Sequence, residues 1–534
     1  MATQTKTLPD SHHVEGASHT PQPVVEEVLD IADVVQEGKY SPWTPSMFRL
    51  YGCLLVAFFC ATINGYDGSV MGGLNAMQSY LDYFDMKSAS SSTGFVFAIY
   101  GIGSIAAVPF CGPLNDWFGR RAALFAGSLI VILGACVTGA AKTHGMFLAG
   151  RFVLGFGVCF CNVTAPVYVG ELAHPVWRGT LMGCYNCFWH IGSILAAWVI
   201  YASKDGGANG WRIPLYCQLI ASGIVVCFIW IVPESPRWLM ANGKNSKARE
   251  ILAQLHGEGS ADHPLVVFQM REMEHQILST PDNKRWWDYS SLWKTRAARR
   301  RMICVVSMSF FGQWSGNSVT NYYLPVMLES AGITSESKKL LLNGIYPVLC
   351  LFGSLTGARL MDVAGRRPLL LISLMVMIGA FSILTPVSKM AAENTSNSSA
   401  ANATIAFIYI FGITYAVGWT LITPVYIVEI LETHQRAKGK SFALLLISAS
   451  STVIQYASGP AFEHLKYYFY IVFIGWDVFE AVIIYLYYPE TKGRTLEELN
   501  EVFEAKNPVK KSLEKKSIQT VLNTMHVEKE TEQE

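Results

Sequence analysis

The sequence has few charged residues for its length. Only 15% of its 534 residues are Asp, Glu, Lys or Arg, whereas 51% are hydrophobic. One soluble domain of this size would need more polar surface, so the composition excludes a large soluble enzyme and indicates a membrane protein. An excess of basic residues is also lacking, because the net charge is +1. We therefore predict no binding to nucleic acid.

Two other features are missing. No cluster of Cys and His residues has the spacing of a zinc site, and the cysteines lie mostly within or beside apolar segments. We expect them to pack against neighbouring helices, with no metal and no cofactor. Residues 1–46 contain no short apolar core of a signal peptide. We therefore expect the first membrane helix itself to direct insertion.

Long apolar segments are what the sequence does contain. A helix that crosses the hydrocarbon core of a bilayer needs about 20 apolar residues. Twelve segments have about this length, at roughly 48–70, 91–112, 121–140, 146–170, 178–201, 213–232, 302–328, 339–361, 368–388, 404–430, 440–462 and 467–488. They predict an all-α membrane protein with twelve transmembrane helices.

Positive charges gather on alternate loops between these segments. With the N-terminus in the cytoplasm, the inner loops carry two Arg-Arg pairs and a basic group at residues 436–440. The positive-inside rule then places the tails, residues 1–46 and 489–534, and the central stretch 233–301 in the cytoplasm. We expect a multi-pass protein of the plasma membrane.

One predicted outer loop carries acceptor sequences for N-glycosylation. They begin at Asn394, Asn397 and Asn402, between the ninth and tenth apolar segments. Glycans are added outside the cytoplasm. The acceptor sequences therefore agree with the predicted topology, and we expect a glycoprotein.

A short motif occurs twice. Asp116-Trp-Phe-Gly-Arg120-Arg121 lies between the second and third segments, and Asp362-Val-Ala-Gly-Arg366-Arg367 lies between the eighth and ninth. Two copies at equivalent positions indicate a duplicated six-helix unit, as in many secondary transporters. We predict two six-helix halves, residues 47–232 and 302–488, with cytoplasmic linker helices at 233–301 between them.

Several motifs at helix ends resemble one known family. They are the Arg120-Arg121 loop, Pro166-Val-Tyr-Val-Gly-Glu171, Pro233-Glu234-Ser-Pro-Arg237 and Pro489-Glu490-Thr. Over about residues 47–500 the chain resembles the sugar porter family of the major facilitator superfamily. Within that family, Gln313-Trp-Ser-Gly-Asn317 and Tyr185-Asn186-Cys-Phe-Trp-His190 resemble the fungal lactose and cellodextrin permeases.

The resemblance implies the major facilitator fold and an ion-pair latch between the halves at the cytoplasmic end. Asp and Arg side chains can form charge-assisted bonds across such a contact. The predicted latch residues are Asp116, Arg120, Arg121, Glu171, Arg178, Glu234, Arg237, Asp362, Arg366, Arg367, Glu429, Arg436 and Glu490.

A sugar site needs amide and hydroxyl side chains for the sugar hydroxyls and an aromatic ring for its apolar face. Gln313, Asn317 and Asn321 are spaced four residues apart, so they share one face of the seventh helix. Amides would be costly against lipid, so this face looks inward. The family resemblance implies that Gln313 and the amide of the fifth helix bind sugar. The predicted substrate-binding residues are Gln313, Asn317, Asn321, Asn186, His190, Trp314, Tyr322 and Trp419.

Alternative roles remain for some of these polar residues. Polar side chains in membrane helices also bond to neighbouring helices without binding any substrate. His190 could bind sugar, take up a proton or pack at a helix interface.

Isolated charges within apolar segments indicate a functional role. Asp67 lies near the outer end of the first segment, and Arg151 opens the apolar part of the fourth. In proton-coupled sugar porters, which the chain resembles, these positions form the coupling pair, so we expect protonation of Asp67 to release Arg151. A structural role at the helix end is the alternative for Asp67. Asp477 and Glu480 of the twelfth segment have no assigned role.

The sequence therefore predicts a secondary active transporter, not an enzyme. We expect a monomer in the lipid bilayer that imports a sugar together with protons. The expected sugar is a disaccharide of the lactose or cellodextrin type. The alternatives are a facilitative carrier, a porter for a hexose, polyol or quinate, and a sugar sensor that hardly transports.

Overall fold

Helices form the regular structure of the protein, as predicted. The computed structural model describes residues 41–279, 289–394, 397–432, 435–494 and 496–514, and no strand occurs in these ranges. Most of both predicted tails, residues 280–288 of the predicted linker helices, and Thr395 and Ser396 of the first glycosylation sequence lie outside the described residues. The chain divides into Met1–Ser41 and Pro42–Glu534, and the second unit contains all the helices described below.

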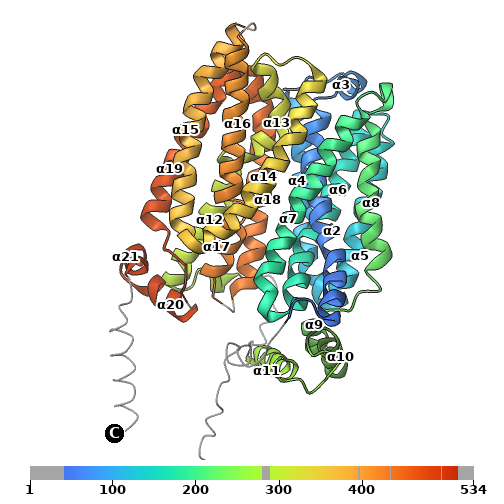
Figure 1. The fold of residues 1–534 in the computed structure, drawn as a ribbon, viewed down its shortest axis with the longest axis vertical. Helices are drawn as coiled ribbons and strands as arrows, with labels where there is room; N and C mark the ends of the chain where they lie inside the picture. Colours follow the sequence, from blue (N-terminus) through green and yellow to red (C-terminus); the bar gives the residue numbers. More distant parts are fainter. Residues whose placement is uncertain (1–40, 280–288, 395–396, 433–434, 495, 515–534) are drawn as a thin grey trace, which may run out of the picture. The chain divides into compact units, whose positions relative to one another are not determined.

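The first half contains six helices, each of which corresponds to one predicted apolar segment (Figure 1). At its start, the Thr44 hydroxyl accepts a hydrogen bond from the Met47 amide, and Pro45 occupies the first helical position. Both features favour a helix N-terminus. The six helices are α2 (Pro45–Leu74), α4 (Ser91–Phe118), α5 (Arg120–Gly139), α6 (His144–Leu172), α7 (Arg178–Ser203) and α8 (Arg212–Phe228).

The second half differs because two predicted segments are broken into pairs of helices. The segment at 302–328 forms α12 (Arg296–Trp314) and α13 (Asn317–Ser330), which meet at Gly316 with a φ of +99°. The segment at 404–430 forms α16 (Ser398–Gly418) and α17 (Ile422–Ile430). Breaks at membrane depth leave backbone groups unpaired and are tolerated where they line a cavity. The unbroken helices are α14 (Glu336–Ala364), α15 (Arg366–Glu393), α18 (Arg436–Leu465) and α19 (Phe469–Tyr487).

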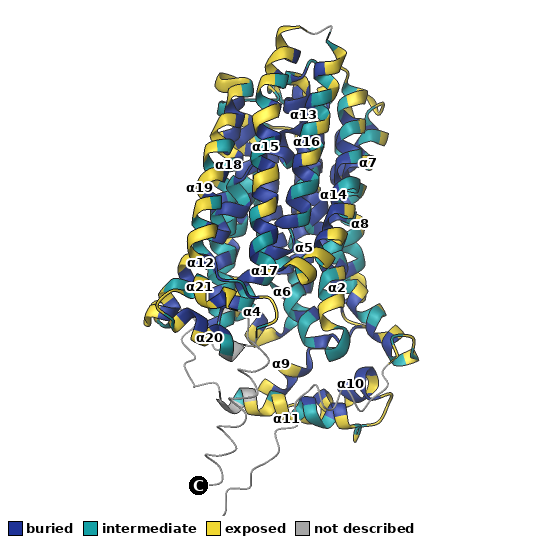
Figure 2. Cartoon of the chain, turned by 60° about the vertical axis from the view of Figure 1, so that its left-hand side comes forward, coloured by how far each residue is buried: buried dark blue, intermediate teal, exposed yellow. Residues whose placement is uncertain are grey.

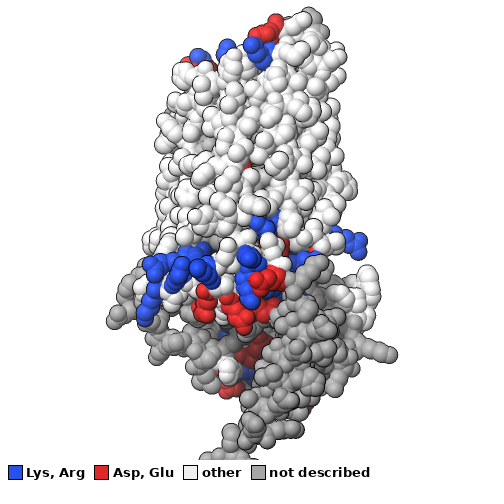
Figure 3. Space-filling view, turned by 90° about the vertical axis from the view of Figure 1, so that its left-hand side faces the viewer, with Lys and Arg blue, Asp and Glu red and all other residues white. Residues whose placement is uncertain are grey.

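Eight of the described helical stretches are long and apolar enough to cross a membrane. Two of these stretches contain a pair of helices each, α16 with α17 and α18 with α19. The remaining helices of the bundle are shorter or more polar than these stretches. They are α7, α8, α12 and α13. On the face shown in Figure 3, Lys, Arg, Asp and Glu gather at the two ends and leave a broad uncharged belt between them. Such a belt is what a hydrocarbon core requires.

Short helices mark one end of the bundle, which we call the linker end. They are α9 (Pro236–Ala241), α10 (Asn245–His256), α11 (Pro264–Ser279), α20 (Leu496–Glu504) and α21 (Pro508–Leu513) (Figure 1). The opposite end carries α3 (Gln78–Phe84), the C-terminal end of α15 and the N-terminal end of α16. Between the ends, the buried parts of the helices face the inside of the bundle and the exposed parts face outward (Figure 2).

The two halves touch mainly along α4 with α18 and along α7 with α14. Close backbone contacts between them lie toward the opposite end. A Cβ atom added to Gly72 would lie 2.3 Å from the Asn321 carbonyl oxygen, and one added to Gly94 would lie 2.6 Å from that of Tyr456. Only glycine permits such close backbone contact. The halves are therefore packed tightly at the end that faces away from the linker.

Candidate substrate site between the two halves

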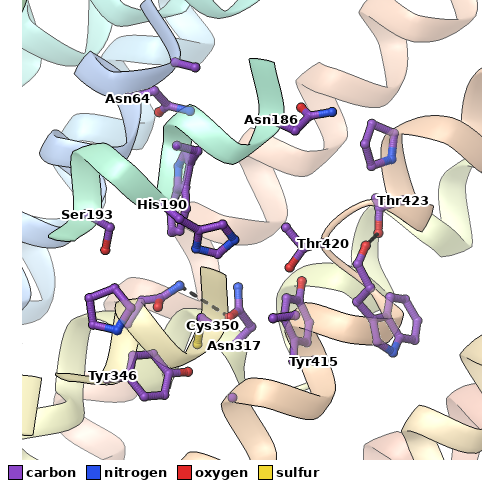
Figure 4. Close-up of a pocket in the computed structure, with 18 of the residues that line it drawn as sticks. Asn64, Asn186, His190, Ser193, Asn317, Tyr346, Cys350, Tyr415, Thr420 and Thr423 are labelled. Atoms are coloured by element: carbon purple, nitrogen blue, oxygen red, sulfur yellow. Dashed lines mark hydrogen bonds between the residues drawn. The ribbon is translucent and has the colours of Figure 1, made fainter. Parts of the chain in front are cut away.

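A cavity of about 270 Å³ lies between the halves. Residues of α2 and α7 line it from the first half, and residues of α12, α13, α14, α16 and α17 line it from the second. Figure 4 shows Asn64, Asn186 and His190 facing Asn317 and Tyr415 across the cavity. Both halves thus contribute polar side chains to one cavity.

The amides that the sequence singled out come together here. Gln313, Asn317, Asn321 and Asn186 all line the cavity. The Asn321 amide donates to the Asn317 side-chain oxygen at 3.4 Å, and the Ser318 hydroxyl donates to the Gln313 side-chain oxygen at 3.2 Å. An amide side chain has two donors and an acceptor with two lone pairs, so capacity remains for a ligand rich in hydroxyl groups.

His190 lines the same cavity and is 3% exposed. Its Nε2 shares a hydrogen bond of 2.7 Å with the Ser354 hydroxyl of α14, across the boundary between the halves. Its Nδ1 is buried and has no hydrogen-bond partner within the described part of the chain. Because buried polar atoms are normally paired, this nitrogen is a candidate contact for a substrate hydroxyl.

Of the three aromatic residues in the predicted substrate-binding set, only Trp419 lines the cavity. Trp314 turns toward α18 instead, where its Nε1 donates to the Ser450 carbonyl at 2.9 Å. Tyr322 packs against Phe97 of the other half, with ring centroids 5.2 Å apart. The reason is their position: Trp314 directly follows Gln313, and Tyr322 directly follows Asn321. Successive residues of a helix point about 100° apart, so these rings face away from the side that the amides share.

Other lining residues were not predicted as ligands. They include Asn64, Tyr185, Trp189, Tyr346 and Thr420. Asn64 could have been predicted from the sequence, since it is an amide within an apolar segment. Thr420 lies in the break between α16 and α17, where an apolar pattern predicts continuous helix.

The predicted coupling residues Asp67 and Arg151 are buried outside the cavity lining, 1% and 0% exposed. Their charges are close enough to interact. No ion pair or hydrogen bond joins them in the described structure, where both carboxylate oxygens and all three guanidinium nitrogens lack a hydrogen-bond partner. The Arg151 guanidinium lies over the Tyr100 ring, 4.7 Å from its centroid. The two residues are therefore near each other but separated.

A network of charged residues holds the linker end of the first half together. Arg120 donates two hydrogen bonds of 2.9 Å to the Glu171 carboxylate. The Glu234 carboxylate accepts from the backbone amides of Arg120 and Arg121 at 3.1 and 3.2 Å, and so caps α5. Gly119, with a φ of +89°, gives room for this carboxylate, because a Cβ there would lie 2.5 Å from it.

The second half repeats the arrangement. Arg366 donates to Glu429 at 2.8 Å, and Glu490 accepts from the amides of Arg366 and Arg367 at 3.0 Å each. Gly365, with a φ of +97°, corresponds to Gly119. The two copies of the sequence motif thus make equivalent hydrogen bonds in the two halves.

The ion pairs of these networks lie within each half, which corrects the prediction of a latch between halves for this conformation. Asp362 pairs with Arg366 at 3.6 Å, and Arg436 donates to the Val428 carbonyl at 3.2 Å. The physical reason is that the halves meet closely at the opposite end. The remaining predicted latch residues are the exposed Asp116 and Arg237, and Arg178, which interacts electrostatically with Glu272.

Comparison with known sequences identifies the family. The sequence matches the family described as "Sugar (and other) transporter" over residues 53–503. The chain belongs to this family. Its members are membrane transporters, so the chain is a transporter and not an enzyme. A related protein of Neurospora crassa, named "MFS-type transporter qa-x", is 29% identical over 88% of this chain and 92% of that protein.

Other relatives differ in the compounds that their names state. A quinate permease of Neurospora terricola is 28% identical over 88% of this chain and 92% of its own length. A high-affinity glucose transporter of Kluyveromyces lactis is 26% identical over 89% of both chains.

Solved structures confirm the fold. The partially occluded inward open conformation of the xylose transporter XylE from E. coli has a TM-score of 0.70 and is 23% identical. The match covers 84% of this chain and 100% of that chain. The predicted major facilitator fold, with two halves of six membrane segments, is therefore correct.

Proposed function

We propose that the protein imports a neutral compound rich in hydroxyl groups and built on one ring, such as a hexose or pentose, by proton symport. The cavity is the observation that carries this proposal. Its amides and His190 suit hydroxyl groups, and Trp419 and Tyr415 offer apolar faces. Because both halves line the cavity, rocking of one half against the other would open it to each side in turn.

The charge of the lining favours a neutral substrate. No Lys or Arg occurs among the described lining residues, and His190 is the one member whose side chain can readily become positive. Quinate, named for several relatives, carries a carboxylate. Burying an unpaired carboxylate is costly, so we expect a sugar to bind better than quinate.

The size of the cavity favours one ring. Its volume of about 270 Å³ lies just below the common range for small-molecule sites, about 300–1,000 Å³. A disaccharide of the lactose or cellodextrin type is the second candidate. It would require the cavity to lengthen as the halves move apart at the linker end.

Proton coupling is assigned to Asp67 and Arg151. An ionised carboxylate without a hydrogen-bond partner is costly in a buried site. Gain or loss of a proton at Asp67 would therefore change the balance between conformations. In this proposal the linker end faces the cytoplasm of a cell whose plasma membrane contains the protein, and the described conformation faces inward.

An uptake experiment tests the proposal. The chain would be produced in a host that lacks its own sugar transporters, and uptake of labelled glucose, xylose, lactose, cellobiose and quinate would be compared. We expect saturable uptake of a monosaccharide, accompanied by alkalinisation of a weakly buffered medium. Uptake of quinate alone would refute the neutral substrate, and sugar uptake without alkalinisation would refute symport.

A further inference from the structure

A second cavity, of about 330 Å³, lies at the linker end of the first half. The ends of α4, α5 and α8 form one side of it, and α9 and α10 form the other. Three basic residues line it: Arg121, Lys244 and Lys247. None of the residues that line this cavity belongs to the substrate site or to the coupling pair Asp67 and Arg151.

The cavity carries a net positive charge. Glu234 is the acidic residue among its described lining. The Glu234 carboxylate already accepts hydrogen bonds from the backbone amides of Arg120, Arg121 and Ser235, at 3.1, 3.2 and 2.8 Å. Lys244 and Lys247 are both exposed, so their ammonium groups are accessible to an anion.

Aromatic rings hold two of the cations in place. The Arg121 guanidinium lies over the Trp230 ring, 5.1 Å from its centroid, and the Lys244 ammonium lies 5.4 Å from that of Trp238. Cations over indole rings gain cation–π stabilisation. The basic groups are therefore partly ordered around the cavity before any ligand binds.

The rim of the cavity is apolar and exposed. Phe118 and Trp230 line it and are 62% and 52% exposed, and Ile231, next in sequence, is 78% exposed. Exposed aromatic residues beside basic ones are typical of the interface between the hydrocarbon core and the headgroups of a bilayer. The rim thus offers a surface for acyl chains, and the interior offers positive charge.

The corresponding corner of the second half is filled by the chain itself. Glu490, the counterpart of Glu234, donates its backbone amide to the Ser512 hydroxyl of α21 at 3.0 Å. Arg494 donates to the Ser512 carbonyl at 2.7 Å. The first half has a cavity where the second half has this helix.

We propose that the cavity binds the phosphate group of an anionic phospholipid in the leaflet at the linker end. Lys244 and Lys247 would contact the phosphate, and the acyl chains would lie over Phe118, Trp230 and Ile231. The Arg121 guanidinium already donates to the Ile229 and Trp230 carbonyls, so it would add positive charge beside the phosphate. A soluble phosphate ester offers the same charge, but the exposed apolar rim favours the lipid. The binding does not depend on the transported substrate; only the assignment of this leaflet to the cytoplasmic side depends on the proposed function.

Lipid retention by the purified full-length chain tests this inference. Native mass spectrometry would count phosphatidylserine and phosphatidylcholine molecules bound after delipidation and controlled re-addition. We expect a preference for phosphatidylserine that falls about tenfold in Lys244→Gln/Lys247→Gln and persists in Lys244→Arg/Lys247→Arg. The matched control is Lys510→Gln/Lys511→Gln, which removes the same charge from α21 at the same end and should keep the preference.

Three results would overturn the proposal. One is an equal affinity of the unaltered chain for the two lipids, and another is the same loss in both glutamine variants. The third is displacement of phosphatidylserine by millimolar inorganic phosphate or glycerol 3-phosphate, which would identify a soluble phosphate as the ligand. Melting of each variant in the same detergent confirms that the exposed substitutions leave the fold intact.

Discussion

His190 of α7 and Ser354 of α14 share a hydrogen bond of 2.7 Å that joins the two halves of the transporter. Both side chains are buried, and His190 lines the substrate cavity whereas Ser354 is not part of the described lining. A hydrogen bond of this kind contributes about 0.5–1.5 kcal/mol. The bond therefore joins a residue of the cavity lining to the other half, and we expect it to couple occupancy of the cavity to the relative position of the halves.

Ser354→Ala removes this bond without altering the cavity lining. We expect the substitution to change the maximal rate of sugar uptake about two- to tenfold, because the state that contains the bond loses about 1 kcal/mol. In a His190→Gln background, which lacks the imidazole, the same change should have little further effect. Ser373→Ala is the matched control, since the Ser373 hydroxyl donates only within α15. If the effects of Ser354→Ala and His190→Gln on the uptake rate were additive, the two residues would not act through their shared hydrogen bond.

Gln313→Ala and Asn317→Ala should each weaken sugar binding. Both amides line the cavity, and loss of a hydrogen bond to a buried hydroxyl costs about 0.5–1.5 kcal/mol, or more where the hydroxyl stays unpaired. We expect the half-saturating sugar concentration to rise about tenfold, with normal amounts of protein at the cell surface. Gln254→Ala, an exposed amide of α10, serves as the control. Unchanged affinity in both cavity variants would place the site elsewhere.

The sequence was sufficient to predict the fold because each membrane helix corresponds to a continuous run of apolar residues. Each predicted segment corresponds to a helix or a pair of helices, and the repeated motif predicted the two halves. The breaks at Gly316 and after Gly418 were not predicted. Hydropathy cannot detect them, since a short unwound stretch between apolar residues leaves the average almost unchanged.

The predicted polar residues that line the cavity are those spaced four apart, both on the unbroken α7 and across the break between α12 and α13. Asn186 and His190, both on α7, face the cavity together. Trp314 and Tyr322 lie outside the lining, because each follows a lining amide by one residue and so points about 100° away from it around the helix axis. Packing between halves, such as that of Tyr322 against Phe97, has no local signal in the sequence.

The proposed topology predicts glycans at the opposite end of the bundle. Asn394 and Asn402 are exposed, whereas the Asn397 side chain accepts the Ala400 amide at 3.1 Å and caps α16. Glycosidase treatment should shift the electrophoretic mobility of the full-length protein, and Asn394→Gln combined with Asn402→Gln should remove most of the shift. Protease added outside intact cells should leave the 233–301 stretch uncut. Cleavage in this stretch would show that it lies outside the cell and would contradict the proposed topology.

Acid should destabilise the contact between α10 and the loop before α7. His174 of this loop is 3% exposed, and its ring lies 5.0 Å from that of His256. Burial, aided by the positive charges of His256, His263 and Arg178, lowers the pKa of His174 to about 3. Since the ordinary value is about 6.5, the stability from neutral His174 is present above pH 6.5 and is lost as the pH falls toward 3.

Between pH 7.5 and 5.5 this loss should amount to about 1 kcal/mol. We expect the melting temperature of the purified protein to fall over this interval, and to fall less in His174→Gln. His464→Gln, which alters an exposed histidine of α18, should behave like the unaltered protein. An identical pH dependence in all three proteins would exclude a role for His174.

Asp67→Asn should abolish accumulation of sugar against a gradient. The substitution keeps the shape of the side chain but fixes it in a neutral form, so the carrier can no longer take up a proton on one side and release it on the other. Exchange of internal for external sugar should survive, because the neutral side chain resembles the protonated carrier. Arg151→Ala should impair both activities, since Asp67 then loses its partner. Asp205→Asn, at an exposed acid between α7 and α8, should leave both unchanged.

Accumulation by Asp67→Asn in response to an inward proton gradient would refute this coupling role. The next candidates for the proton site would then be Asp477 and Glu480 of α19, which are both 0% exposed. None of their four carboxylate oxygens has a hydrogen-bond partner in the described structure. Unpaired carboxylates at membrane depth are costly unless protonated or functional, so Asp477→Asn and Glu480→Gln are the variants that would distinguish a second proton site from a structural role.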